Sequence, residues 1–162
     1  MCSYLYHLLA TCLCVCIVKV FCSPCNIRVV SKGWYDVGST YVTIATSNGT
    51  VLGGSNGVNI YTVDSKTCVA KWMQISDDLN FYIDSTRAST RTINILSSIA
   101  QDTIVIVAVQ DTGPYMYSSS NNPSLYAALR NLGATVSSFQ VRSSYVLISL
   151  SLIHISEPTR PY

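Results

Sequence analysis

The central part of the chain lacks two residue types on which much enzyme chemistry depends. The full sequence has 162 residues, and residues 23–149 contain no histidine and no glutamate. Ser-His-Asp triads, histidine general bases and histidine-ligated metal sites all need an imidazole, so these sites are excluded there. The remaining aspartate, serine, tyrosine and lysine residues show no catalytic spacing. We therefore predict a protein that is not an enzyme and that has no catalytic residue, metal site or cofactor.

Charged residues are also scarce. They make up 11% of the chain, and the formal net charge is +2. Residues 23–149 hold eight Lys or Arg and seven Asp, a net charge of +1, and the basic residues occur singly rather than in runs. A nucleic-acid-binding protein usually carries a clustered basic face. We therefore expect no nucleic-acid partner.

The longest apolar stretch lies at the N-terminus. Residues 4–18 are almost continuously apolar, and Val20-Phe-Cys22 suits the −3 to −1 positions of a signal-peptidase site. We predict that residues 1–22 are a signal peptide, and that the secreted, extracellular protein has no membrane segment after cleavage. An uncleaved signal-anchor is the alternative, because residues 4–22 are nearly long enough to span a bilayer. That alternative predicts a protein anchored in the Golgi or cell-surface membrane.

The C-terminal end resembles a sequence of a different origin. Residues 151–162 look like the translation of a sequencing adaptor read in frame, so we predict that residues 150–162 are a non-native tail. The segment that remains, residues 26–149, is long enough for one domain. This interpretation implies that the natural protein continues differently beyond the domain.

Two cysteines lie between these ends, Cys25 and Cys68. In a secreted chain an even pair predicts one disulfide bond, which closes a loop and restricts the unfolded chain. Two unpaired thiols, or a partner elsewhere in the natural protein, are the alternatives.

Asn48-Gly49-Thr50 carries two signals at once. It is an acceptor sequence for N-glycosylation, as expected in a surface loop of a secreted glycoprotein. Asn-Gly also tolerates the positive φ angles of a type I′ hairpin turn. Both properties place Asn48 at the tip of a hairpin.

The strongest structural signal is the run Thr103–Val109, in which every residue is apolar or β-branched. It is too short for a membrane span and predicts a strand that is covered on both faces, at the centre of the core. Polar residues where a central strand ends commonly lie at the rim of a fold. Asp111, two residues beyond the run, is therefore the first candidate for a functional role.

The other elements follow from periodicity and from turn residues. Alternation predicts an edge strand over residues 26–31 and further strands over residues 41–46, 58–64, 69–75, 138–142 and 144–149. Residues 51–57 predict a glycine-rich loop, and 84–87 a polar connector. Three-and-four spacing predicts helices over residues 90–101, capped by Ser89 or Thr90, and from Pro123 to a stop at Gly133. This order indicates an α+β domain with sheets covered by short helices.

Four blocks in this order resemble the domain of the interleukin-like EMT inducer and pancreatic-derived factor family (ILEI/PANDER): Gly57–Asp64, Asp102–Asp111, Leu125–Gly133 and Val141–Ile148. The resemblance implies a compact fold of two mainly antiparallel β-sheets lined by short helices, without catalysis by the domain itself. Relatives are small secreted signalling proteins, or modules of a cell-surface hyaluronan-binding protein and of a Golgi O-mannose N-acetylglucosaminyltransferase stem, where the module binds a sugar.

The function that the resemblance implies is a secreted, non-catalytic binding module, either cytokine-like or lectin-like. Its partner would be a glycan or a cell-surface receptor. The alternative is a stem or accessory carbohydrate-binding module of a larger membrane-anchored glycosyltransferase or hyaluronan-binding protein, truncated here.

The resemblance also implies a carbohydrate site. In the sugar-binding relative the contacts include the Asp that ends the central strand and the Arg of an Arg-Asp-x-Trp block, positions held here by Asp111 and Arg142. A carboxylate accepts hydrogen bonds from two sugar hydroxyls, and a guanidinium donates in a fixed fork. The alternatives are a structural salt bridge between Asp111 and Arg142 at the rim of the sheet, or a turn cap formed by Asp111 alone.

Further positions complete this candidate site. Tyr145 offers a ring that can stack on a sugar, and Asn56 stands where the family has a basic residue in the glycine loop. Two other positions also depart from the family pattern: Gln110 replaces a Lys and Ser143 replaces an Asp.

Overall fold

The computed structural model describes residues 16–22, 25–32, 41–73, 84–101, 103–111, 113–114, 119–139 and 144–151, the first of these segments at the level of the backbone. They form the following elements: β1 (Cys16–Cys22), β2 (Cys25–Lys32), β3 (Tyr41–Thr46), β4 (Val51–Gly53), β5 (Gly57–Asp64), β6 (Ala70–Trp72), α1 (Ser85–Ser97), β7 (Thr103–Gln110), α2 (Pro123–Asn131) and β8 (Tyr145–Leu150).

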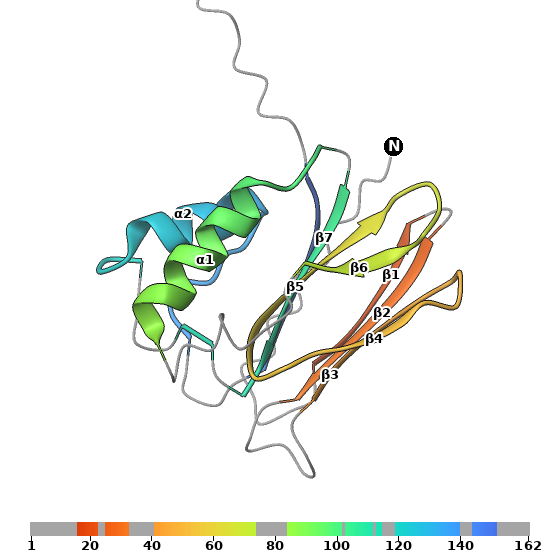
Figure 1. Ribbon diagram of the computed structural model, residues 1–162, viewed down its shortest axis with the longest axis horizontal. Coiled ribbons are helices and arrows are strands. Elements are labelled where there is room, and N and C mark those ends of the chain that lie inside the picture. Colours follow the sequence, from red (N-terminus) through yellow and green to blue (C-terminus); the bar gives the residue numbers. More distant parts are fainter. Residues whose placement is uncertain are drawn as a thin grey trace, which may run out of the picture.

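The strands form two antiparallel sheets. The first has the order β1-β2-β3-β4 and the second the order β6-β5-β7-β8. Figure 1 shows that the second sheet is the middle layer, with the first sheet on one side and both helices on the other. This arrangement confirms the predicted α+β class and the two antiparallel sheets lined by short helices.

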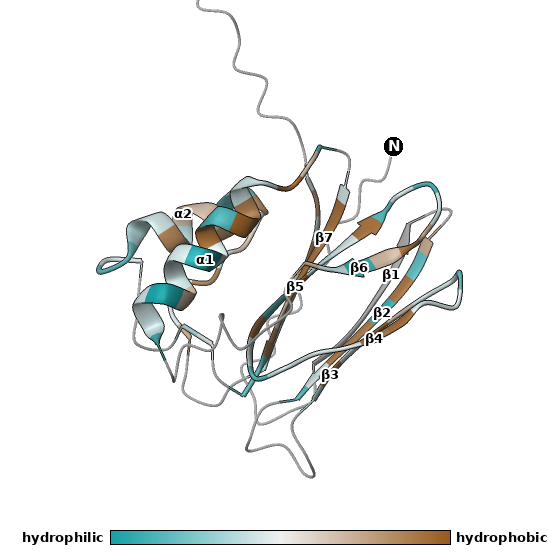
Figure 2. Ribbon diagram, viewed as in Figure 1, coloured by the Kyte–Doolittle hydropathy of each residue, from teal (hydrophilic) through white to brown (hydrophobic). Residues whose placement is uncertain are grey.

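The central position of β7 explains its continuous apolar sequence. Val105, Val107 and Val109 belong to the core under the helices, whereas Ile104, Ile106 and Ala108 belong to the core between the sheets. Successive side chains of a strand point to opposite faces, so a strand with two covered faces needs apolar residues at every position. The hydropathy colouring follows this pattern, with a continuous brown stretch along β7 (Figure 2).

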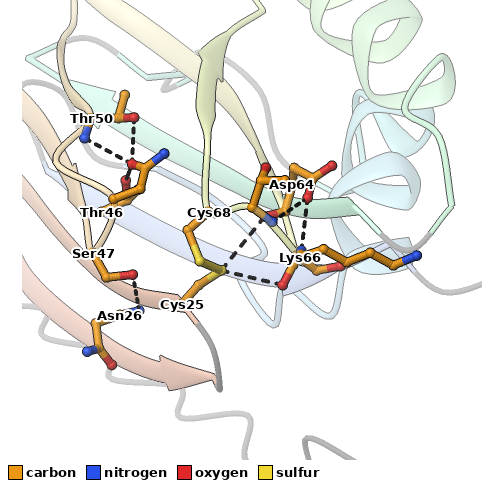
Figure 3. Close-up of a disulfide and its surroundings, with 11 residues drawn as sticks. Cys25, Asn26, Thr46, Ser47, Thr50, Asp64, Lys66 and Cys68 are labelled. Carbon is orange, nitrogen blue, oxygen red and sulfur yellow. Dashed lines mark hydrogen bonds between the residues drawn. A yellow bond between two sulfur atoms is a disulfide. The ribbon is translucent and has the colours of Figure 1, made fainter.

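A disulfide bond and a hydrogen bond join the two sheets. The Cys25–Cys68 disulfide, with a Cα–Cα distance of 5.3 Å, connects the first residue of β2 to the turn between β5 and β6 (Figure 3), which confirms the predicted pair. At the other end of β2, the buried Ser31 hydroxyl donates to the carbonyl of Val109 in β7.

Asp64 shapes the turn that carries Cys68. Its carboxylate accepts hydrogen bonds from the backbone amides of Lys66 and Thr67, at 2.9 and 2.7 Å. These bonds, led by the one from Thr67, lower the pKa of the Asp64 carboxyl below its ordinary value. The turn ends with Cys68 in the left-handed conformation, at φ 60°.

Helix α1 begins five residues before the predicted start. Asp84 is its N-cap, and the Asp84 carboxylate accepts from the amide of Arg87 at 2.9 Å. The prediction of a polar connector over residues 84–87 was wrong, because the first turn contains only polar and small residues and so lacks an apolar stripe. Its buried positions include Ala88 and Ser89.

Helix α2 confirms the predicted start and stop. Asn122 caps the helix and Pro123 follows in the first turn, where a missing amide costs little. At the end, Gly133 has φ 85° and its amide donates to the Arg130 carbonyl, while the Ala134 amide donates to the Leu129 carbonyl. These two bonds are the Schellman motif, for which glycine is the usual residue.

Strand β2 differs from its prediction as an edge strand. It lies between β1 and β3, and β1 pairs with it over seven residues. Strand β1 falls within residues 1–22, the segment predicted to be a signal peptide, and the cleavage of that segment stays a prediction. Within the described residues, no helix is long and apolar enough to cross a membrane.

Smaller differences concern the hairpins. The first three residues of the predicted glycine-rich loop form β4, and β6 is shorter than predicted. Asn48 is not among the described residues with positive φ, so the Ser47–Thr50 turn is not type I′. At the C-terminal end, β8 includes Leu150, which pairs with Ile104, although we assigned Leu150 to the tail.

Candidate functional site

Asp111 lies directly after the last residue of β7 and is partly exposed. Its φ of 61° puts it in the left-handed region, where only one other non-glycine residue of the described part is found. Residues other than glycine rarely adopt this conformation, although aspartate does so more readily than most. Gly113 lies close to the end of β7, since a Cβ on it would be 3.0 Å from Val109 Cγ1. The backbone therefore presents Asp111 at the end of the sheet.

An amide pair joins Gln110, the residue before Asp111, to the glycine loop. Gln110 lies opposite Gly57 in the β5–β7 ladder, and Gln110 Nε2 donates to Asn56 Oδ1 at 3.0 Å. Gln110 is 7% exposed, whereas Asn56 is exposed to solvent. The bond fixes the orientation of the Asn56 carboxamide. Its Nδ2 carries two N–H donors in addition to the oxygen that accepts from Gln110.

A buried asparagine, Asn59, forms hydrogen bonds to the backbone of the glycine loop. Asn59 is fully buried, its Nδ2 donates to the carbonyls of Ser55 and Gly57 at 2.7 and 3.2 Å, and its Oδ1 accepts from the Ser55 amide at 2.8 Å. A buried amide with its polar atoms satisfied gives a rigid, specific geometry. Sequence reasoning missed Asn59, although a lone amide within the apolar strand Gly57–Asp64 was a signal for such a role.

A tyrosine completes the support. Tyr61, fully buried between the sheets, donates from its hydroxyl to the Gly53 carbonyl at 2.7 Å, and burial raises the pKa of its phenol. Gly54 leaves room for this contact, because a Cβ there would lie 2.8 Å from both Tyr61 Oη and Val42 Cβ. The loop that carries Asn56 therefore rests on the core between the sheets.

Tyr145 occupies the neighbouring strand. It lies opposite Val109, two residues before Asp111, and its ring meets Phe139 edge-on at a centroid distance of 5.1 Å. Burial raises the pKa of Tyr145 to about 12, so the phenol is neutral at physiological pH. The side chain is partly exposed and otherwise packs against the core under the helices.

The structure thus brings three predicted site residues, Asn56, Asp111 and Tyr145, to the same end of the second sheet. Arg142 and Ser143 lie outside the described residues, so the pairing of Asp111 with Arg142 stays a prediction. In the described part of the chain, no three His, Cys, Asp or Glu side chains form a group that could hold a metal ion.

Comparison with known families finds a family model that matches the chain. Residues 56–150, more than half of the sequence, match the model of the family described as "Interleukin-like EMT inducer". The matched segment begins at Asn56 and ends with the last residue of β8, so it includes the whole candidate site. No curated protein matches the chain. The family match, together with the two-sheet fold, shows that the chain belongs to the interleukin-like EMT inducer family, which is cytokine-like.

Proposed function

We propose that this chain is a secreted, non-catalytic module that binds carbohydrate at the end of β7. The observation that carries the proposal is the left-handed conformation of Asp111, at φ 61°, beside the Asn56–Gln110 amide pair. Conformations that cost free energy concentrate at binding sites, because surrounding structure must hold them in place. Here the glycine loop and the β5–β7 ladder provide that structure.

The chemistry of the group suits sugar hydroxyls. The Asp111 carboxylate would accept from a sugar hydroxyl, and hydrogen bonds to a charged acceptor are stronger than neutral ones. The exposed Asn56 carboxamide donates from Nδ2 while its Oδ1 accepts from Gln110. Arg142 would add a forked donor, and the partly exposed Tyr145 side chain would add an apolar contact.

The composition of this end favours a glycan over a protein receptor. Protein interfaces usually have a core of large apolar and aromatic side chains. The large hydrophobic residues that are exposed in the described part of the chain are Tyr41, Val51, Val69, Met73 and Leu150. Val51 lies in β4, and none of the five lies in residues 54–57 or directly after β7.

The Cys25–Cys68 disulfide supports a secretory location, since disulfides persist in oxidising compartments. An anchored Golgi or cell-surface protein would have the same bond. N-terminal sequencing of the protein collected from culture medium separates the two, because only the cleaved protein begins after the leader.

A glycan array tests the binding proposal. The full chain would be applied to immobilised oligosaccharides, including N-acetylglucosamine-terminated and hyaluronan-derived ones, beside Asp111→Asn and the control Asp84→Asn. Both variants lose one negative charge, and asparagine still caps α1 at position 84. We expect binding by the wild type and the control and loss of signal with Asp111→Asn. Binding to cells without any array signal, lost in the same variant, would instead support a protein receptor.

A further inference from the structure

The hairpin between β3 and β4 presents the single N-glycosylation acceptor of the sequence. Asn48 is the only asparagine of the 162-residue chain that fits Asn-X-Ser/Thr with X other than proline; Asn122 also has a serine two positions later, but Pro123 between them excludes it. It is exposed, and Gly49 takes the positive φ of the turn, at 85°. The Thr46 amide donates to the Thr50 carbonyl, and the Gly49 amide donates to the Thr46 carbonyl, each at 3.0 Å, so the tip is closed by backbone bonds.

The Asn48 side chain is oriented by its oxygen. Oδ1 accepts from the Thr50 amide at 3.0 Å, from the Thr50 hydroxyl at 2.7 Å and from the Thr46 hydroxyl at 2.6 Å. Within the described residues Nδ2 makes no hydrogen bond, so it is the part of the carboxamide that remains open to a reactant. Three donors on Oδ1 also draw electron density from the amide and favour loss of a proton from Nδ2.

From this geometry we infer that Asn48 carries an N-linked glycan, and that this glycan lies at the end of the fold opposite to the candidate binding site. The donor would be an oligosaccharide on a polyprenyl pyrophosphate. Asn48 Nδ2 forms a bond to the anomeric carbon of the sugar, the bond from that carbon to the pyrophosphate oxygen breaks, and Nδ2 loses one proton. No electrons are exchanged, and the lipid pyrophosphate leaves with the bonding pair.

The ladder of the second sheet gives the separation between the two sites. Thr103, at the start of β7, pairs with Asp64, and Cys68 of the same turn is bonded to Cys25. The Asn48 hairpin lies at this end, because the Asn26 amide donates to Ser47 Oγ at 3.3 Å (Figure 3). Asp111 follows the other end of β7, and eight strand residues span about 26 Å. A glycan on Asn48 therefore leaves the Asp111 end uncovered.

The test uses the full chain with a second acceptor sequence appended after Tyr162, expressed in cells that export proteins. The inference rests on the proposed secretion, and the appended acceptor reports export independently. Asn48→Asp keeps an oxygen acceptor in place of Oδ1 but removes the amide nitrogen. Thr50→Ser keeps the hydroxyl and is the matched control.

We expect two glycans on the wild type and on Thr50→Ser, and one on Asn48→Asp, measured as the mass removed by a glycan-cleaving amidase. A wild type that is modified only at the appended acceptor would overturn the inference and leave the secretion intact. A chain modified at neither acceptor would overturn the proposed secretion and the inference with it. Array binding should be the same with and without the Asn48 glycan, and weaker binding by the glycosylated form would contradict the placement at opposite ends.

Discussion

Replacing Gly54 with alanine probes how closely the glycine loop approaches the core. A Cβ at this position would lie 2.8 Å from Tyr61 Oη, 2.8 Å from Val42 Cβ and 2.9 Å from Asn59 Oδ1. None of these atoms can move freely. Val42 Cβ is fixed by the backbone of β3, and the other two atoms are held by hydrogen bonds to the loop itself. The extra methyl group must therefore displace the loop.

The cost follows from two contributions. Inserting a methyl group into a close-packed site costs about 1–3 kcal/mol. Displacing the loop also weakens the bond from Tyr61 to the Gly53 carbonyl, and a hydrogen bond contributes about 1 kcal/mol. Alanine restricts the unfolded chain and so returns about 0.4–1 kcal/mol. We predict that Gly54→Ala lowers the free energy of unfolding by about 2–3 kcal/mol, which is a large fraction of the stability of a typical domain.

Urea denaturation monitored by tryptophan fluorescence measures this change, because Trp72 stacks on Tyr61 at a centroid distance of 6.2 Å. Gly53→Ala is the matched control: no atom lies within 4 Å of its Cβ position, and its φ is not positive. The control should keep the wild-type midpoint or exceed it. Equal midpoints for both variants would show that the loop does not rest on Tyr61 and Asn59 as described.

Two further perturbations test the core between the two sheets. Replacing both Cys25 and Cys68 with alanine should lower the free energy of unfolding by about 4 kcal/mol, because the bond closes a 43-residue separation; a loss below about 1 kcal/mol, measured by urea denaturation, would mean that the pair is not bonded. Ile106→Ala should cost about 2–5 kcal/mol through a cavity in the fully buried centre of β7. An unchanged melting midpoint would place this strand elsewhere.

The sequence was sufficient for those features in which one local signal dominates. The apolar run Thr103–Val109 predicted a doubly covered strand, and Pro123 and Gly133 predicted both ends of α2. In each case the deciding residues are close together in the sequence and need no distant partner. The family resemblance added the two-sheet arrangement, which no single segment reveals.

Features that depend on distant partners were harder to predict. The start of α1 was missed because Asp84 caps the helix through its side chain while the first turn shows no apolar stripe. The turn at Asn48 was assigned positive φ angles, but the Asn48 oxygen is occupied by hydroxyls and an amide from both sides of the hairpin. Likewise, the role of Asn59 depends on a loop that folds back over its strand.

The central claim, that Asp111 binds carbohydrate, is tested most directly by titrating the full chain and Asp111→Gly with an oligosaccharide identified on the array. Glycine adopts φ 61° without strain, so the variant should stay folded while it lacks the carboxylate. Loss of a hydrogen bond to a charged group costs about 1.5–3 kcal/mol, which predicts an affinity about 10- to 100-fold lower. A folded Asp111→Gly variant that binds as tightly as the wild type would contradict the claim.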